Sequence, residues 1–216
     1  MPETCDSDRT ALHEGNEPDR APWEAFMRTR TSATDPIEVA EIRHPDHPGV
    51  IGVTICPGKK ARSTFGGAWD RDLAQDLQLI QDTFGPKAII TLMPEYELAG
   101  AGVAGLGQAV SDLGMQWHHL PIEDMEAPDK EFEEAWKEAL TEIVGIVQNG
   151  GSVLVHCRGG LGRSGTVAAI ILIELGMAAE NAVTIVRAAR PGAIENREQE
   201  CYVRRYSASG QHSSDE

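Results

Sequence analysis

Residues 151–166 constrain the fold of this 216-residue chain more than any other stretch, because they read G-S-V-L-V-H-C-R-G-G-L-G-R-S-G-T. Val153–Val155 form a short apolar run, which predicts a buried strand. Three of the five residues in Arg158–Gly162 are glycine, which favours a tight turn. The apolar run that follows predicts a helix over Arg163–Leu175. Cys157 is therefore expected at the end of a buried strand, in a turn that leads into a helix.

This arrangement predicts a phosphate-binding site. The free N–H groups of a tight turn and of a first helical turn bind anions, and the helix dipole favours negative charge there. Arg163 can add two parallel hydrogen bonds to a phosphate group. The same field favours the thiolate form of Cys157, which can attack phosphorus, and Ser164 can hydrogen-bond the sulfur when it leaves. The predicted phosphate-binding residues are Arg158, Gly159, Gly160, Leu161, Gly162 and Arg163.

The segment H-C-R-G-G-L-G-R-S-G resembles the Cys-x5-Arg-Ser/Thr signature of the cysteine-dependent protein tyrosine and dual-specificity phosphatases. Three other segments, I-G-V-T-I-C-P-G-K-K, H-H-L-P-I-E-D and G-A-I-E-N-R-E-Q-E-C-Y-V, follow the order found in the kinase-associated phosphatase branch of that family. The resemblance extends over roughly Ile37–Tyr206. It implies a phosphatase that forms a phosphocysteine intermediate on Cys157.

The order of predicted elements independently indicates an α/β fold. Alternating strands and helices favour a central, mostly parallel sheet flanked by helices on both faces, as in protein tyrosine phosphatases. Ligands of such sheets bind at the carboxyl ends of the strands, where Cys157 lies. The predicted strands are Ile37–Arg43, Val50–Cys56, Ala88–Leu92, Met115–Leu120 and Val153–Val155, and the predicted helices are Leu73–Thr83, Gly105–Leu113, Lys130–Gln148, Arg163–Leu175, Ala178–Arg190 and Asn196–Arg205.

Hydrolysis of a phosphoester also requires a proton donor for the leaving oxygen. The family resemblance implies an aspartate on a loop upstream of the cysteine, and Asp124 in P-I-E-D fits that pattern. Glu123, Glu126 and Asp129 are the alternatives. Asp129 directly precedes the predicted helix at Lys130, where aspartate commonly caps the N-terminus. Asp124 is therefore the predicted general acid.

The resemblance implies two supporting residues. His156 is expected to orient the loop through hydrogen bonds, and Gln199 to position the attacking water, although Gln199 can also belong to the polar face of the last helix. Arg158 either contacts the substrate or extends into solvent, with only its main chain in use. Cys56 is expected to be a packed apolar side chain, and the alternative is a second cysteine that traps the oxidised nucleophile as a disulfide.

Composition limits the kinds of partner. The chain has 19 Lys and Arg against 34 Asp and Glu, a net charge of −15, which argues against general binding of nucleic acid or an anionic membrane. The cysteines are scattered, and neither a disulfide framework nor a metal site is expected. A catalytic thiolate needs a reducing compartment, so we expect a cytoplasmic protein. No cofactor is expected. The four cysteines are Cys5, Cys56, Cys157 and Cys201.

One phosphatase domain is predicted over residues 36–206. Residues 1–35 are polar and rich in Asp, Glu, Pro and Thr, and are expected to be flexible, as is the tail formed by residues 207–216. The N-terminus has no apolar run of the kind found in secretion signals. We expect a monomer.

The loop also bears on the substrate. It has no lysine, whereas the phosphoinositide phosphatases of the superfamily carry lysines there, so the resemblance favours a phosphorylated protein. The prediction is a protein phosphatase that hydrolyses phosphotyrosine, phosphoserine or phosphothreonine monoesters. Three alternatives remain: an RNA 5′-triphosphatase, a rhodanese-like sulfurtransferase, and a phosphoprotein-binding module without catalytic activity.

Overall fold

The central feature of the protein is a five-stranded sheet. The computed structural model describes residues 28–62 and 66–208. The first strand of the sheet is antiparallel to its neighbour and the other pairings are parallel, so the mostly parallel sheet is confirmed. In spatial order the strands are β2 (Ala40–Arg43), β3 (Val50–Thr54), β8 (Ser152–His156), β6 (Ala88–Thr91) and β7 (Gln116–His119).

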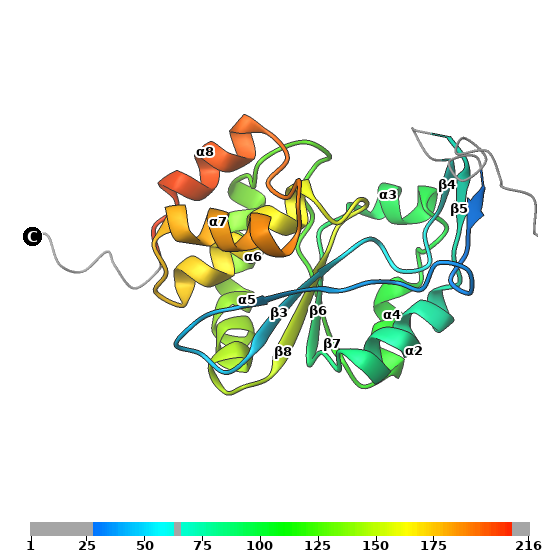
Figure 1. Cartoon of the computed structure of the whole chain (residues 1–216), viewed down its shortest axis with the longest axis horizontal. Helices are drawn as coiled ribbons and strands as arrows, with labels where there is room; N and C mark the ends of the chain where they lie inside the picture. The colour runs from blue at the N-terminus through cyan, green and yellow to red at the C-terminus, as the bar shows by residue number, and fades with distance from the viewer. Residues whose placement is uncertain (1–27, 63–65, 209–216) are drawn as a thin grey trace, which may run out of the picture.

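Helices cover both faces of the sheet, as predicted (Figure 1). One face carries α5 (Lys130–Gln148), α6 (Gly162–Glu174), α7 (Ala179–Ala189) and α8 (Arg197–Arg205). The other carries α2 (Leu73–Thr83), α3 (Glu95–Gly100) and α4 (Leu106–Asp112). Within the described ranges, no helix has the length and apolar character needed to cross a membrane.

Strand β8 lies at the centre of the core. Its side chains alternate, so Val153 and Val155 pack in the cluster that includes α6, whereas Leu154 packs in the cluster on the other face. Helix α6 is buried from Gly162 to Ile173, because it is packed between the sheet and the helices around it. Burial on all sides explains why its sequence lacks a polar stripe. The loop between β8 and α6 is therefore held between two fully packed elements.

The sequence did not predict a second, small sheet. In it, β5 (Ala68–Asp70) pairs in parallel with β1 (Thr29–Arg30) and antiparallel with β4 (Lys60–Arg62). These strands have two or three residues each, and most of their residues are polar and at least partly exposed. A hydrophobic pattern of period two cannot appear in so short a stretch. Helix α3 was also missed, since six residues are too few for a helical pattern.

The folded body begins earlier than predicted. Residues 28–35 were assigned to the flexible N-terminal segment, but they contain β1 and are bonded to the body. Arg71 donates a hydrogen bond from Nη1 to the carbonyl of Asp35 at 2.7 Å, and the Ser32 hydroxyl accepts the N–H of Asp72 at 2.9 Å. At the other end, Ala208 packs in the core. The rest of the two predicted flexible segments, residues 1–27 and 209–216, lies outside the described residues.

Candidate active site

The loop after β8 brings the predicted nucleophile and its partners together. Cys157 is buried, with 3% of its surface exposed. Its Sγ accepts a hydrogen bond from the N–H of Gly160 at 3.3 Å and lies 3.4 Å from Oγ of Ser164. Both contacts stabilise negative charge on sulfur, because an N–H group and a hydroxyl can each donate to a thiolate.

Gly160 and Gly162 are required by the geometry of this loop. Gly160 has φ = 66°, and a Cβ there would lie 2.6 Å from the carbonyl group of Thr54. A Cβ on Gly162 would lie 2.8 Å from a carboxylate oxygen of Glu195. Gly162 opens α6, and the N-cap residue Leu161 gives no side-chain hydrogen bond to the helix. The first amides of α6 therefore have no cap from Leu161 and are available to an anion, which the predicted phosphate site requires.

Arg163 is held by a residue that sequence analysis missed. Its guanidinium is buried and bonded through Nη1 and Nη2 to the two carboxylate oxygens of Glu97, at 2.7 and 3.1 Å. Nη1 also donates to the carbonyl of Ile122 at 2.9 Å. Glu97 lies in the first turn of α3, which follows β6, the strand next to β8. An acidic residue just after the carboxyl end of a neighbouring strand was the signal available in the sequence.

Among the four acid candidates, Asp124 lies at the site. Its Oδ1 accepts a hydrogen bond from Nη2 of Arg163 at 2.8 Å, while 59% of its side chain is exposed to solvent. Asp129 instead caps α5, where it accepts the N–H of Phe132 at 2.8 Å. The carboxylate of Glu123 is bonded to the hydroxyl of Tyr96.

The segment that carries Asp124 is anchored to α8. Asn196 donates to the carbonyl of Met125 at 2.7 Å, and Gln199 donates through Nε2 to the carbonyl of Glu126 at 3.2 Å. Gln199 is fully buried and lines the same pocket as Cys157, so it does not lie on an exposed face of α8. The structure thus brings Gln199, the acid segment and the loop together.

His156 is buried behind the loop and neutral. Its Nε2 forms a hydrogen bond of 2.8 Å with Oγ1 of Thr91, which also accepts a bond from the indole N–H of Trp117 at 2.9 Å. Burial lowers the pKa of His156 to about 4. The bond links β8 to β6 beneath the site, so it fixes the strand end from which Cys157 extends.

This burial predicts a stability change at mildly acid pH. The unfolded chain takes up a proton on His156 below its ordinary pKa of about 6.5, whereas the folded chain does not until about pH 4. The contribution is therefore fully present above pH 6.5 and is lost as the pH falls toward 4, by about 3 kcal/mol in total. Urea unfolding of the native chain and of His156→Gln at pH 7, 6 and 5 measures this as a steeper decline for the native chain. Parallel declines would contradict it.

Cys56 is a packed apolar side chain, as expected. It is fully buried, its thiol donates weakly to the carbonyl of Pro57 at 3.5 Å, and burial raises its pKa to about 12. Such a thiol is a poor nucleophile. No group of three or more His, Cys, Asp or Glu side chains is placed to hold a metal ion in the described part of the chain.

A pocket of about 850 Å³ opens over the loop. Cys157, Arg163, Asp124 and Gln199 line this pocket. The exposed side chain of Arg158 also lines it. A buried cysteine in an amide loop, a fixed guanidinium and a nearby carboxylic acid are the groups needed to transfer a phosphoryl group to sulfur.

Comparison with known proteins agrees with this chemistry. A family described as "PTP-SAK: Swiss Army Knife protein, DSP-PTPase phosphatase domain" matches residues 71–203, which is more than half of the chain. The chain belongs to this phosphatase family. It is therefore a cysteine-dependent phosphatase of the dual-specificity and protein tyrosine type, and the phosphatase fold predicted from the sequence is confirmed.

Named relatives fit the same description. Rat cyclin-dependent kinase inhibitor 3 is 28% identical over 159 residues, which cover 72% of this chain and 71% of the relative. A probable type IVA protein tyrosine phosphatase of Dictyostelium discoideum is 37% identical over 99 residues, or 44% and 59% of the two chains. A solved structure of kinase associated phosphatase, with its catalytic-site cysteine replaced by serine, is similar with a TM-score of 0.68 and 27% identity, covering 78% of this chain and 92% of that one.

Proposed function

We propose that this phosphatase hydrolyses phosphotyrosine, phosphoserine or phosphothreonine in proteins through a phosphocysteine on Cys157. One observation supports the assignment above the others. Asp124 lies 2.8 Å from the guanidinium of Arg163, and both residues line the pocket into which the Cys157 loop opens. The proposed general acid Asp124, the phosphate-binding Arg163 and the nucleophile Cys157 therefore line one pocket.

In the first step, the thiolate of Cys157 attacks phosphorus and the bond between phosphorus and the ester oxygen breaks. The amides of the loop and the guanidinium of Arg163 stabilise the charge on the three equatorial oxygens. A bound phosphate competes with Asp124 for Nη2 of Arg163, which frees the acid to face the leaving oxygen. Protonated Asp124 gives its proton to that oxygen.

In the second step, water attacks phosphorus and the bond between sulfur and phosphorus breaks. Asp124, now a carboxylate, takes a proton from the water, and Gln199 helps to orient it. The hydroxyl of Ser164 donates to Sγ and stabilises the thiolate that leaves. Inorganic phosphate departs with the enzyme in its starting form. The chain's own amides, arginine and acid carry both steps.

The surroundings favour a protein substrate over the alternatives. A net charge of −15 opposes RNA binding, which disfavours an RNA 5′-triphosphatase. A binding module without activity has no use for an acid at 2.8 Å from the phosphate-binding arginine. A thiolate nucleophile suits a reducing compartment, so the proposal includes a cytoplasmic location and a monomer that acts without nucleic acid or cofactor.

Replacing Asp124 with asparagine tests the mechanism. We expect kcat to fall by roughly 10²-fold and the alkaline limb of the pH–rate profile to flatten, because the group that must be protonated is gone. Phenyl phosphate, whose leaving group needs a proton, should lose far more rate than p-nitrophenyl phosphate. Steady-state kinetics on both esters between pH 4.5 and 8.5 measures the effect.

Glu126→Gln is the matched control, since Glu126 is an exposed acid two residues further along the same segment. It removes the same charge and should keep the native profile. If Asp124→Asn keeps its alkaline limb and treats both esters alike, Asp124 is not the general acid and the role moves to Glu123 or Glu126.

A further inference from the structure

Lys59 is a buried lysine that the proposed mechanism does not use. Only 7% of its surface is exposed, yet it lines the pocket that holds Cys157. Its ammonium donates to the carbonyl of Arg158 at 3.1 Å and lies 4.2 Å from the ring centre of Trp69. No carboxylate forms an ion pair with it among the residues the structure describes. A buried ammonium with one carbonyl and one aromatic face for partners can still bind an anion.

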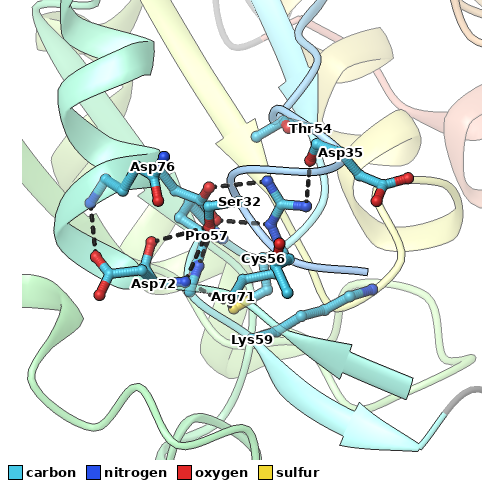
Figure 2. Close-up of polar contacts among 12 residues, drawn as sticks. Ser32, Asp35, Thr54, Cys56, Pro57, Lys59, Arg71, Asp72 and Asp76 are labelled. Carbon is cyan, nitrogen blue, oxygen red and sulfur yellow. Dashed lines mark hydrogen bonds and ion pairs between the residues drawn. The ribbon is translucent and has the colours of Figure 1, made fainter. Parts of the chain in front are cut away.

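The main chain of Lys59 is fixed by a buried ion pair. Arg71 and Asp76 are each 1% exposed and are joined by two hydrogen bonds, at 2.7 and 2.8 Å. Asp76 also accepts the N–H of Gly58 at 2.8 Å, and Arg71 donates its own N–H to the carbonyl of Lys59 at 3.3 Å. Figure 2 shows the Lys59 side chain extending away from this cluster, with its amine directed toward the loop after β8. The fold therefore fixes the main chain from which the amine of Lys59 extends toward the pocket.

Other cations surround this position. The guanidinium of Arg30 lies 5.0 Å from the ring centre of Trp69, and both residues line the pocket. Among the residues that the structure describes, two acidic ones line it, Asp124 and Glu195, against six basic ones. A pocket that is so basic, on a chain of net charge −15, concentrates anions. The basic residues are Arg30, Lys59, Arg62, Arg158, Arg163 and Arg190.

This arrangement changes an expectation drawn from the sequence. The lack of lysines in the loop favoured a phosphorylated protein over a phosphoinositide and gave the loop itself no lysine for a second anion, but Lys59 and Arg30 reach the pocket from other segments of the chain. Burial lowers the pKa of Lys59 to about 8, so the ammonium is mostly charged at neutral pH, and an anion beside it would stabilise that charge further. The pocket has a volume of about 850 Å³, which leaves room for more than a phosphoryl group.

We propose that Lys59, Arg30 and Trp69 form a second anion site, which binds an acidic side chain next to the phosphorylated residue of a protein substrate. Both cations lie over the ring of Trp69, and all three residues line the pocket. The scissile phosphate occupies the Cys157 loop while the flanking carboxylate pairs with Lys59. This proposal rests on the proposed protein phosphatase activity and concerns the selection of substrate within it.

Two phosphopeptides that differ only in flanking residues test the proposal, one with Asp and Glu and the other with Asn and Gln. We expect the native enzyme to prefer the acidic peptide in kcat/KM by roughly tenfold, since a charge-assisted hydrogen bond contributes on that order. In Lys59→Met, which keeps an apolar stem against Trp69, the ratio of the two kcat/KM values should fall to about one. Arg30→Gln should lower the ratio by a smaller amount. Because Arg30 is more exposed than Lys59, this variant is a second test of the same site.

Lys60→Gln is the matched control. Lys60 is the next residue, and its ammonium is 3.3 Å from the carboxylate of Asp70 on an exposed surface, so the variant loses the same charge without touching the pocket. It should keep the native ratio. A native ratio near one, or an unchanged ratio in both Lys59→Met and Arg30→Gln, would overturn the second site. Turnover of the neutral peptide by the native enzyme separates the two proposals, because its absence would instead exclude the phosphatase mechanism.

Discussion

Replacing Cys157 with serine should abolish the hydrolysis of p-nitrophenyl phosphate while leaving the protein able to bind a phosphoprotein. Sγ receives hydrogen bonds in a buried loop at the start of α6, a setting that favours a thiolate but not an alkoxide. A serine hydroxyl there stays protonated and attacks phosphorus poorly. Loss of a nucleophile lowers kcat by roughly 10⁴- to 10⁶-fold, and the amides and Arg163 that bind the phosphate remain.

Steady-state kinetics gives the loss of turnover, and capture of a phosphopeptide on immobilised Cys157→Ser protein gives the retained binding. Cys201→Ser is the matched control, because Cys201 is a half-buried cysteine on α8 that does not line the pocket, and its turnover should match the native enzyme. The native Cys157 should also react with iodoacetamide, and vanadate should protect it. Measurable turnover by Cys157→Ser, or alkylation that vanadate does not slow, would exclude the mechanism.

Local sequence was enough to predict the loop and the elements on either side of it. The predicted helices Leu73–Thr83 and Lys130–Gln148 agree with α2 and α5 to the residue, because both have an aspartate cap and a clear apolar stripe. The strand before Cys157 and the helix after Gly162 are both apolar and need little else to define them. The position of Cys157 follows directly from that pattern.

The rest of the site depends on contacts between distant segments, and local sequence does not encode those. Glu97 is 66 positions from Arg163, and Lys59 is 99 positions from Arg158. Each is a charged residue in a stretch with no distinctive pattern, and its place a few residues after a strand is the only signal that the sequence offers. Only the order of strands, with β3 and β6 on either side of β8, brings their neighbouring segments to the edge where Cys157 lies.

Replacing Arg163 with lysine should lower kcat/KM by roughly 10³-fold, the second largest effect expected here. The guanidinium donates two hydrogen bonds to Glu97, and in the proposed mechanism it also binds the phosphate. Only a planar group with several N–H donors can bind both partners at once. A lysine keeps the positive charge beside Glu97, so the buried carboxylate is not left unpaired, but it cannot offer parallel hydrogen bonds to a phosphate. The expected loss is therefore catalytic, with little change in the free energy of unfolding.

Glu97→Gln tests how much of the catalytic role of Arg163 depends on the carboxylate that positions its guanidinium. Glutamine keeps one oxygen acceptor for Arg163, so a modest fall of roughly tenfold is expected, and combining it with Arg163→Lys should add little, because both changes act on one unit. Arg204→Lys, the same substitution on an exposed arginine of α8, is the control and should keep native turnover. If Arg163→Lys retains more than about a tenth of the native kcat/KM, a positive charge alone is sufficient at this position. The proposal that Arg163 binds the transferring phosphoryl group through two parallel hydrogen bonds would then be wrong.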